Sequence, residues 1–333
     1  MIGILGNGSW ATALAKLLTE NHHRIAWWMR SEAAVTHLEE QGHNEQYLSS
    51  VLFEPDQIKP TTDLNFMLTQ CNVLVMCIPS AFMFDVLRRM PKDSLKGKKI
   101  ISAIKGILPE QHQLLQEYLT DHFEIELKDY FAITGPCHAE EVAQERLSYL
   151  TFSGVHTDDC QYIAALFETT YLRTTTNNDL WGSQYAAVLK NIYAVGAGIA
   201  HGLGYGDNFL SVYITSCYRE MHRFLSQHFL QMNEQDTTPD FHTSAYLGDL
   251  LVTCYSPHSR NRTFGALLGK GYSVAAAKAE MNMVAEGYFA SLGMKTIIDQ
   301  TGIDMPIMQY IYDMLWQQKS CQGTFKKIEL LLC

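Results

Sequence analysis

Two lysines and an aspartate are the residues of this sequence best suited to chemistry. Lys190 lies within the small, apolar stretch 188–194, where an ammonium group is costly to bury unless it has partners. Burial would lower the pKa of such a lysine and an adjacent carboxylate would raise it, which is how a lysine becomes a proton donor near neutral pH. A lysine that reaches solvent from the same helix is the alternative interpretation.

Lys105 and Asp249 could assist such a proton donor. Lys105 follows the buried apolar run 99–104, and ligands of parallel sheets bind at the carboxyl ends of the strands. It could therefore hold a carbonyl oxygen or the nicotinamide region of a cofactor, although an ordinary loop lysine fits the pattern too. Asp249 and Thr253 are four residues apart, which puts them on one face if this segment is helical.

A basic cluster at residues 259–262 could bind a phosphate group. Ser259 suits the N-cap of a following helix, and Arg260, Asn261 and Arg262 would add fork donors and an amide to the first-turn N–H groups. A basic, capped loop at the surface is the alternative. The net charge of −10 disfavours nucleic acid as a partner, so any anion site must be local.

The N-terminus carries the pattern of a dinucleotide-binding loop. Gly6, Gly8 and Ala11 fit GxGxxA between the apolar run 1–5 and a helical pattern that follows. The first glycine permits a tight turn, the second lets a pyrophosphate approach the backbone, and a small third residue lets the helix pack on the strand. The alternative is a structural turn.

Arg30 bears on the choice between NAD and NADP. It follows the second predicted strand, residues 24–29, where an acidic residue normally binds the ribose of NAD. Arg30 could instead lie over the adenine or neutralise a 2′-phosphate, which slightly favours NADP. Glu32 lies nearby and keeps NAD open, and Arg30 could also be a solvated arginine at a strand end.

The secondary-structure pattern that would position these residues changes near residue 180. Apolar runs at 72–78, 99–104 and 129–134, with shorter ones at 148–153 and 171–175, alternate with helical patterns and predict a Rossmann-like, doubly wound α/β domain over residues 1–180. From residue 181 onward the patterns are helical, which predicts an all-α substrate-binding domain over 181–333. Its expected helices lie at 184–200, 209–229, 263–269, 273–279, 282–299 and 305–318, with an exposed polar loop at 233–242.

Length and composition indicate the class of protein and its cellular location. The 333 residues suffice for two domains, and 47% hydrophobic with 18% charged residues is typical of a soluble globular protein. No signal peptide or membrane-spanning stretch is evident, so we expect a cytoplasmic protein without stable membrane insertion. The eight cysteines are scattered without zinc-like spacing, so we expect reduced thiols and no bound metal.

Six stretches, in order along nearly the whole chain, resemble the NAD(P)-dependent glycerol-3-phosphate dehydrogenases of the bacterial type. This resemblance implies contacts between the cofactor and Ser9, Trp10, Arg30, Lys105, Ala139, Arg260, Val284 and Glu286, and between the substrate and Lys105, Gly135, Cys137, Lys190, Asn191, Asp249, Thr253, Ser259, Arg260 and Asn261. The stretches are GNGSWATALA (6–15), SAIKGI (102–107), TGPCHAEEVA (134–143), LKNIYAVGAGIAHGLGYGDN (189–208), LGDLLVTCYSPHSRNRTFG (247–265) and VAEG (284–287) with Met305-Pro306-Ile307.

The resemblance implies hydride transfer between NAD(P)H and dihydroxyacetone phosphate, giving sn-glycerol 3-phosphate for phospholipid synthesis, by a homodimer. Lys190 would donate the proton, Lys105 would stabilise developing negative charge, Asp249 would hold Lys190, and Arg260 with Asn261 would clamp the phosphate. Three residues depart from the family pattern: Ala11 replaces a glycine, Cys137 a serine or threonine, and His138 a phenylalanine.

Two other functions fit parts of the pattern. A reductase of another oxo acid, of the 3-hydroxyacid dehydrogenase or ketopantoate reductase type, would share the two domains and a helix lysine, but a carboxylate needs no anion socket as large as 259–262. A nucleotide-sensing module would bind NAD(P)H without turnover, and would give no reason for Lys105, Lys190 and Asp249 to converge.

Overall fold

The chain divides into two compact units in a computed structural model, which describes residues 1–232, 239–281 and 284–332. The first unit comprises Met1–Ile104 and Leu114–Leu180, and the second comprises Lys105–Gln113 and Trp181–Cys333. The short segment Lys105–Gln113 thus belongs to the second unit, which a single division at residue 180 does not anticipate. The predicted loop at 233–242 lies largely outside the described residues.

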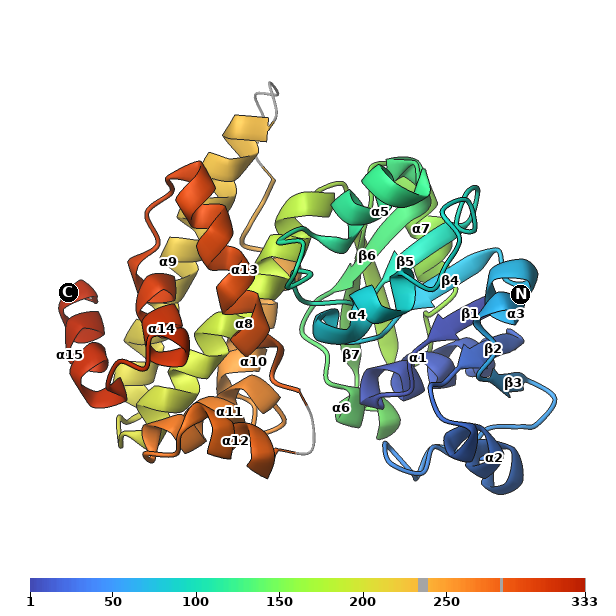
Figure 1. The fold of residues 1–333 in the computed structure, drawn as a ribbon, viewed down its shortest axis with the longest axis horizontal. Coiled ribbons are helices and arrows are strands. Elements are labelled where there is room, and N and C mark those ends of the chain that lie inside the picture. Colours follow the sequence, from blue (N-terminus) through green and yellow to red (C-terminus); the bar gives the residue numbers. More distant parts are fainter. Residues whose placement is uncertain (233–238, 282–283, 333) are drawn as a thin grey trace. The chain divides into compact units, whose positions relative to one another are not determined.

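A single mostly parallel sheet forms the centre of the first unit (Figure 1). Its strand order is β3-β2-β1-β4-β5-β6-β7-β8, in which only the β6–β7 pair is antiparallel. This order confirms the predicted Rossmann-like, doubly wound fold. The strands are β1 (Ile2–Leu5), β2 (Ile25–Trp28), β3 (Ile58–Thr61), β4 (Val73–Met76), β5 (Lys99–Ser102), β6 (Tyr130–Thr134), β7 (Ser148–Ser153) and β8 (Leu172–Asn177).

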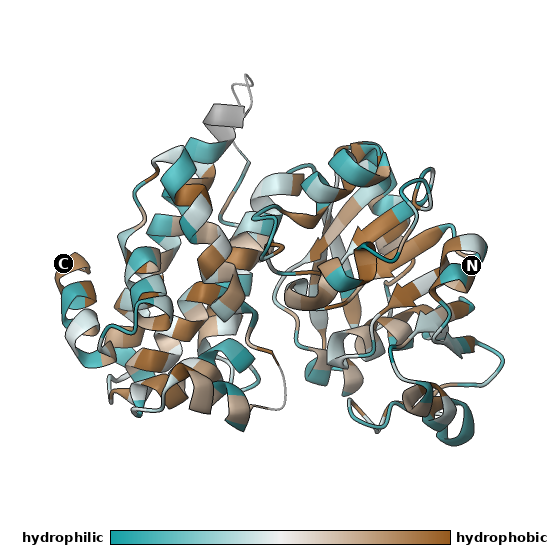
Figure 2. Ribbon diagram, in the orientation of Figure 1, coloured by the Kyte–Doolittle hydropathy of each residue, from teal (hydrophilic) through white to brown (hydrophobic). Residues whose placement is uncertain are grey.

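Some strands have a clear pattern in the sequence and others do not. Every residue of β1 and β2 is buried, as expected of parallel strands covered on both faces, and Figure 2 shows the inner strands as predominantly apolar. Strand β3, which was not predicted, is a four-residue edge strand that alternates in burial and contains Pro60. The helices of this unit are α1 (Ser9–Glu20), α2 (Glu32–Gln41), α3 (Leu64–Gln70), α4 (Ser80–Leu87), α5 (Leu115–Phe123), the short 3-10 helix Leu127–Asp129, α6 (Ala139–Ala143) and α7 (Thr157–Ala165).

From residue 181 onward, the regular elements among the described residues of the second unit are all helices, as predicted. The expected helix at 282–299 begins at Glu286, with 282–283 outside the described residues, and the helix at 321–331 was not predicted. The helices are α8 (Leu180–Gly202), α9 (Asp207–Met232), the π-helix Ser244–Gly248, α10 (Asp249–Tyr255), α11 (Arg260–Gly269), α12 (Val274–Glu280), α13 (Glu286–Thr301), α14 (Pro306–Trp316) and α15 (Cys321–Leu331).

Helices α8 and α11 approach one another at backbone distance. A β-carbon added at Gly198 would lie 2.0 Å from the carbonyl oxygen of Arg262, and one at Gly265 would lie 2.0 Å from that of Val195. Only glycine fits at such contacts. Glycines in both helices therefore let α11 pack closely against the C-terminal half of α8.

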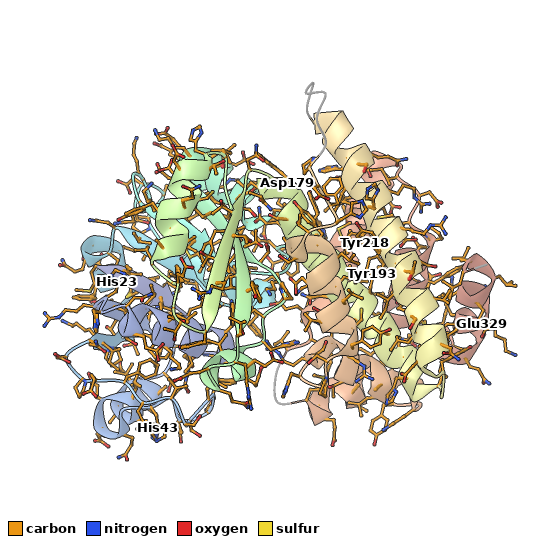
Figure 3. All side chains as sticks on the ribbon, turned by 180° about the vertical axis from the view of Figure 1, so that it is seen from behind. His23, His43, Asp179, Tyr193, Tyr218 and Glu329 are labelled. Carbon is orange, nitrogen blue, oxygen red and sulfur yellow. The ribbon has the colours of Figure 1, made fainter. Side chains whose placement is uncertain are left out.

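A buried carboxylate connects helices α8, α9 and α14 of this unit. Glu220 on α9 is 3% exposed and accepts hydrogen bonds from the amides of Ile307 and Met308, at the start of α14, at 2.8 Å each. Tyr193 of α8, labelled in Figure 3, donates its hydroxyl hydrogen to the same carboxylate at 3.1 Å. The carboxylate thus satisfies first-turn N–H groups of α14 that have no partner within their own helix.

The structure also shows the state of the cysteines and whether any helix could span a membrane. The seven cysteines among the described residues are free thiols. No helix in the described part of the chain is both long and apolar enough to cross a membrane.

Candidate active site

The second unit holds a buried lysine–aspartate pair. Lys190 comes from the middle of α8 and Asp249 is the first residue of α10; they are 4% and 1% exposed. The Lys190 ammonium group donates to Oδ1 of Asp249. One turn later on α10, the Thr253 hydroxyl donates to the Asp249 carbonyl at 2.6 Å, and its oxygen lies 3.4 Å from Oδ1. Both charges are therefore partnered inside the helical unit.

Burial gives Lys190 the acid–base range of a proton donor. Removal from water lowers its pKa from 10.5 to about 7, which outweighs the opposing attraction of Asp249, while the charge of Lys105 lowers it further. A side chain with a pKa near the operating pH can both give and take a proton. The local helix alone does not produce this state, because it depends on the contact with α10.

Lys105 joins this pair from the segment Lys105–Gln113. Its Nζ lies 3.9 Å from Oδ2 of Asp249, and its side chain is 17% exposed. The Lys105 carbonyl oxygen accepts a hydrogen bond from the Asn191 side chain at 3.0 Å, which fixes the backbone of the segment against α8. The structure therefore brings Lys105, Lys190 and Asp249 together around one carboxylate.

A relay of side-chain amides holds three helices beside this cluster. The Asn261 amide on α11 donates to the Asn191 oxygen on α8 at 2.9 Å. The Asn261 oxygen in turn accepts the backbone N–H of Gly287, near the start of α13, at 2.9 Å. Both asparagines are at most 7% exposed. The relay continues the bond from Asn191 to Lys105, so one network spans α8, α11, α13 and the segment at 105.

The start of α11 has the electrostatics of an anion site. The Ser259 side chain caps the helix by accepting from the Arg262 amide at 3.3 Å, and the first turn carries two arginines and no acidic residue. The helix dipole is unfavourable for cations at the N-terminus of a helix and favourable for an anion there. The buried Nε of Arg262 has no hydrogen-bond partner among the described residues.

The glycine loop of the first unit lies between β1 and α1. Gly6 has a φ of +114°, and a β-carbon there would lie 2.6 Å from the Cys77 carbonyl oxygen. Gly8 precedes the first turn of α1, and a β-carbon there would meet nothing within 4 Å. Ala11 is fully buried against the sheet, so a small residue is needed there. The loop thus has the strained turn and the open space that a pyrophosphate needs.

The remaining predicted residues are distributed over both units. Arg30 is exposed two residues after the end of β2, and Gly135 has a φ of +113° between β6 and α6. The predicted residues of the first unit are Gly6, Gly8, Ser9, Trp10, Arg30, Gly135, Cys137 and Ala139, and those of the second are Lys105, Lys190, Asn191, Asp249, Thr253, Ser259, Arg260, Asn261, Val284 and Glu286.

Sequence reasoning overlooked two side chains beside the glycine loop. Trp27 of β2 donates its indole N–H to the Gly6 carbonyl at 2.7 Å, and Asn44 donates to the Asn7 carbonyl at 2.9 Å. Trp27 lies in an apolar strand, where the pattern predicts only that a tryptophan packs in the hydrophobic core. Asn44 follows Gly42 in a polar loop, and nothing in its neighbours marks it as a partner of Asn7.

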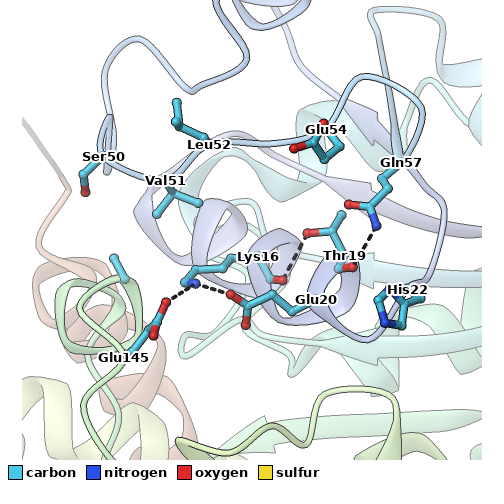
Figure 4. Close-up of a pocket in the computed structure, with 11 residues that line it drawn as sticks. Lys16, Thr19, Glu20, His22, Ser50, Val51, Leu52, Glu54, Gln57 and Glu145 are labelled. Atoms are coloured by element: carbon cyan, nitrogen blue, oxygen red, sulfur yellow. Dashed lines mark hydrogen bonds and ion pairs between the residues drawn. The ribbon is translucent and has the colours of Figure 1, made fainter.

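A hollow of the first unit lies at the other end of α1 (Figure 4). Lys16 lines it and forms ion pairs with Glu20 and, at 3.0 Å, with Glu145. Burial opposes the charge on Lys16, but the hydrogen bonds to the two glutamates raise its pKa overall. None of the predicted site residues lines this hollow, and its lysine is paired with two of its glutamates.

A glycine loop on a Rossmann-like sheet, followed by a helical unit with a buried lysine–aspartate pair, is the arrangement of a nicotinamide-dependent dehydrogenase. Comparison with known proteins supports the same class of enzyme. Residues 1–159 match the family model described as NAD-dependent glycerol-3-phosphate dehydrogenase N-terminus, and residues 179–326 match the one described as its C-terminus. The chain belongs to the NAD-dependent glycerol-3-phosphate dehydrogenase family.

Individual relatives cover nearly the whole chain. A glycerol-3-phosphate dehydrogenase (NAD(P)+) of Enterococcus faecalis is 32% identical over 330 residues, which span 99% of this chain and 95% of the relative. The crystal structure of glycerol-3-phosphate dehydrogenase from Coxiella burnetii has a TM-score of 0.89 at 27% identity and covers 98% of both chains. A ketopantoate reductase of Ralstonia eutropha has a TM-score of 0.58 at 14% identity, covering 97% of this chain and 99% of its own, and shows a likeness of fold alone. Assignment to another oxo-acid reductase is therefore less well supported.

Proposed function

We propose that this protein interconverts dihydroxyacetone phosphate and sn-glycerol 3-phosphate with NAD(P)H. The observation that carries this proposal is the buried Lys190–Asp249 pair with Lys105 beside it, in a chain of this family. In this proposal residues 1–180 bind the cofactor and residues 181–333 bind the substrate, with Lys105–Gln113 contributed to the helical unit.

The glycine loop fits the diphosphate of NAD(P)H. The N–H groups at the start of α1 are placed to receive negative charge, and the open space at Gly8 leaves room for a phosphate against the backbone. We assign Ser9 and Trp10 to the same group, Arg30 to the adenosine end with a slight preference for NADP, and Ala139, Val284 and Glu286 to further cofactor contacts. When bound, the reduced nicotinamide supplies the hydride that the ketone carbon accepts.

Lys190 gives the proton in this mechanism. As the ketone oxygen gains negative charge, the Lys190 ammonium group transfers a proton to it, and a pKa of about 7 allows that transfer at neutral pH. Asp249 holds the Lys190 ammonium group in position through Oδ1. Lys105 stabilises the developing oxyanion, a kind of contribution worth about 10²- to 10³-fold in rate. In the reverse direction Lys190 accepts the proton.

The substrate phosphate binds at the start of α11. Arg260 provides a guanidinium group there, and the N–H groups of the first helical turn add their dipoles. Asn261 uses one amide hydrogen on Asn191, which leaves the second for the phosphate. Gly135 and Cys137 complete the substrate contacts in this proposal. Binding energy from the phosphate then orients the carbonyl for reaction.

Three further attributes belong to the proposal. The protein acts in the cytoplasm, forms a homodimer and supplies glycerol 3-phosphate for phospholipid synthesis. The dimer rests on the family resemblance and on the frequency of two-fold symmetric dimers among soluble enzymes. Sedimentation of the purified chain would measure its oligomeric state directly.

Initial rates with dihydroxyacetone phosphate, measured in parallel with NADH and NADPH, test the proposed reaction. Ketopantoate and other 2-oxo acids serve as competing substrates in the same assay. We expect turnover of dihydroxyacetone phosphate at least about 10²-fold more efficient than of any oxo acid, because the phosphate socket has no role for a carboxylate. Cofactor binding without turnover of any substrate would instead indicate a nucleotide-sensing module.

A further inference from the structure

Two carbonyl oxygens of the glycine loop are hydrogen-bonded from behind by side chains of other segments. The Trp27 indole N–H, from β2, donates to the Gly6 carbonyl oxygen at 2.7 Å. The Asn44 amide, from the loop after α2, donates to the Asn7 carbonyl oxygen at 2.9 Å. The two donor side chains are 0% and 5% exposed, so they are part of the packed interior of the first unit.

Asn44 is satisfied in a way that fixes its orientation. Its second amide hydrogen contacts the Thr12 hydroxyl at 2.9 Å, and that hydroxyl donates to the Gly8 carbonyl at 3.1 Å. Its oxygen accepts the backbone N–H groups of Gln46 and Tyr47 at 3.1 and 3.3 Å. The opposite amide orientation would set donors against these two N–H groups and an acceptor against the Asn7 carbonyl, so only one orientation satisfies the network.

Holding these carbonyls decides where the loop amides point. In a planar trans peptide the C=O of one residue and the N–H of the next point in opposite directions. Because the Gly6 and Asn7 oxygens are directed toward Trp27 and Asn44, the N–H groups of Asn7 and Gly8 are directed away from these side chains. The open space at Gly8 is where an anion can reach such amides.

We propose that Trp27 and Asn44 are positioning residues for the diphosphate of NAD(P)H. They set the direction of the loop amides before the cofactor arrives, so binding does not have to order the loop. The inference rests on the proposed function, because it assumes that this loop binds NAD(P)H. Trp27 and Asn44 touch the loop carbonyls and act on the cofactor only through the amides of Asn7 and Gly8.

The neighbouring tryptophan provides a matched control. Trp28 also lies in β2, is 3% exposed, and donates its indole N–H to a backbone carbonyl, that of Thr62, at 3.0 Å. Trp27→Phe and Trp28→Phe each remove one such bond and a similar volume. Only Trp27→Phe releases a carbonyl of the glycine loop.

Isothermal titration of the full chain with NADH and with NADPH is the test. We expect Trp27→Phe to raise the Kd of the preferred cofactor about 5- to 30-fold, while Trp28→Phe changes it less than about 2-fold, at comparable melting temperatures. In the rate assay, the KM for the cofactor should rise with little change in kcat or in the KM for the ketone. A general loss of folding would not produce this split.

Asn44→Asp is the second variant, chosen in case Trp27→Phe does not fold. It keeps the shape and the acceptor of Asn44 but removes both donors, so we expect a Kd raised at least about 10-fold that stays raised at high salt, where added charge is screened. If both variants bind the cofactor within 2-fold of the unaltered chain, the positioning role is wrong. If the unaltered chain binds neither NADH nor NADPH, the proposed function fails as well, a result distinct from equal binding by all variants.

Discussion

The ammonium group of Lys190 contacts Oδ1 of Asp249 in the interior of the helical unit, where the two side chains are 4% and 1% exposed. A buried charge without a partner would be strongly destabilising, so each of these residues depends on the other. The pair joins α8 to α10 across 59 positions of sequence. Its role in holding the fold and its proposed role in proton transfer lead to separate measurable consequences.

Removing the lysine should abolish most of the activity. Lys190→Met keeps the aliphatic stem but removes the proton donor, and we expect kcat for reduction of dihydroxyacetone phosphate to fall about 10²- to 10⁴-fold. Lys270→Met, at an exposed lysine after α11, is the control and should retain full activity. Steady-state rates measure both variants. Turnover of Lys190→Met close to that of the control would remove Lys190 from the mechanism.

The stability of Lys190→Met should reflect the aspartate left behind. Asp249 would lose the buried ammonium group on its Oδ1, and the Lys105 Nζ lies farther away, 3.9 Å from Oδ2, so we expect a loss of about 3–5 kcal/mol in the free energy of unfolding. The double variant Lys190→Met with Asp249→Asn removes the uncompensated charge and should recover part of that loss. Denaturant unfolding of the three proteins provides the comparison. A double variant less stable than the single one would contradict this account.

The pH dependence of the two directions should be opposite. Lys190, with a pKa lowered to about 7 by burial, must be protonated to reduce the ketone and unprotonated to accept a proton from the alcohol. The rate of ketone reduction should therefore fall as the pH rises through about 7, while that of glycerol 3-phosphate oxidation rises over the same range. Profiles of kcat/KM between pH 5 and 9, about two units on either side of that pKa, measure this. Parallel profiles for the two directions would exclude Lys190 as the titrating group.

The sequence predicts those parts of the fold that repeat a simple pattern. The buried runs that became β1, β4 and β5 and the amphipathic pattern that became α9 are local properties of the chain, so the doubly wound sheet and the helical domain were both expected. Strand β3 was not predicted because a four-residue edge strand containing a proline has no such pattern.

The site is predictable in its residue types, and the family resemblance also predicts the contact between Lys190 and Asp249, but the residue pattern alone does not predict the contacts. Motifs indicated Lys105, Lys190 and Asp249 separately, but their meeting depends on the tertiary packing of α8, α10 and the segment at 105. No sequence pattern reveals that Trp27 and Asn44 reach the carbonyls of the glycine loop, because these hydrogen bonds join residues 21 and 37 positions apart.

The two glycines of the loop should fail in different ways. Gly6→Ala forces a side chain into a φ of +114° and against the Cys77 carbonyl at 2.6 Å, so both the melting temperature and cofactor binding should fall. A β-carbon at Gly8 meets nothing within 4 Å, so Gly8→Ala should fold normally but occupy the space proposed for the phosphate. Melting curves and titration with NADH separate the two effects. Normal cofactor binding by Gly8→Ala would place the diphosphate elsewhere.

Close packing of α8 on α11 should matter to the site as well as to stability. A β-carbon at Gly198 would lie 2.0 Å from the Arg262 carbonyl, so Gly198→Ala must push the two helices apart, at a cost of about 1–3 kcal/mol in the free energy of unfolding. The shift would stretch the 2.9 Å bond between Asn191 and Asn261, and we expect the KM for dihydroxyacetone phosphate to rise more than that for the cofactor. Gly206→Ala is the matched control, because a β-carbon there meets nothing within 4 Å. Equal behaviour of the two variants would mean that helix spacing does not set the geometry of the phosphate site.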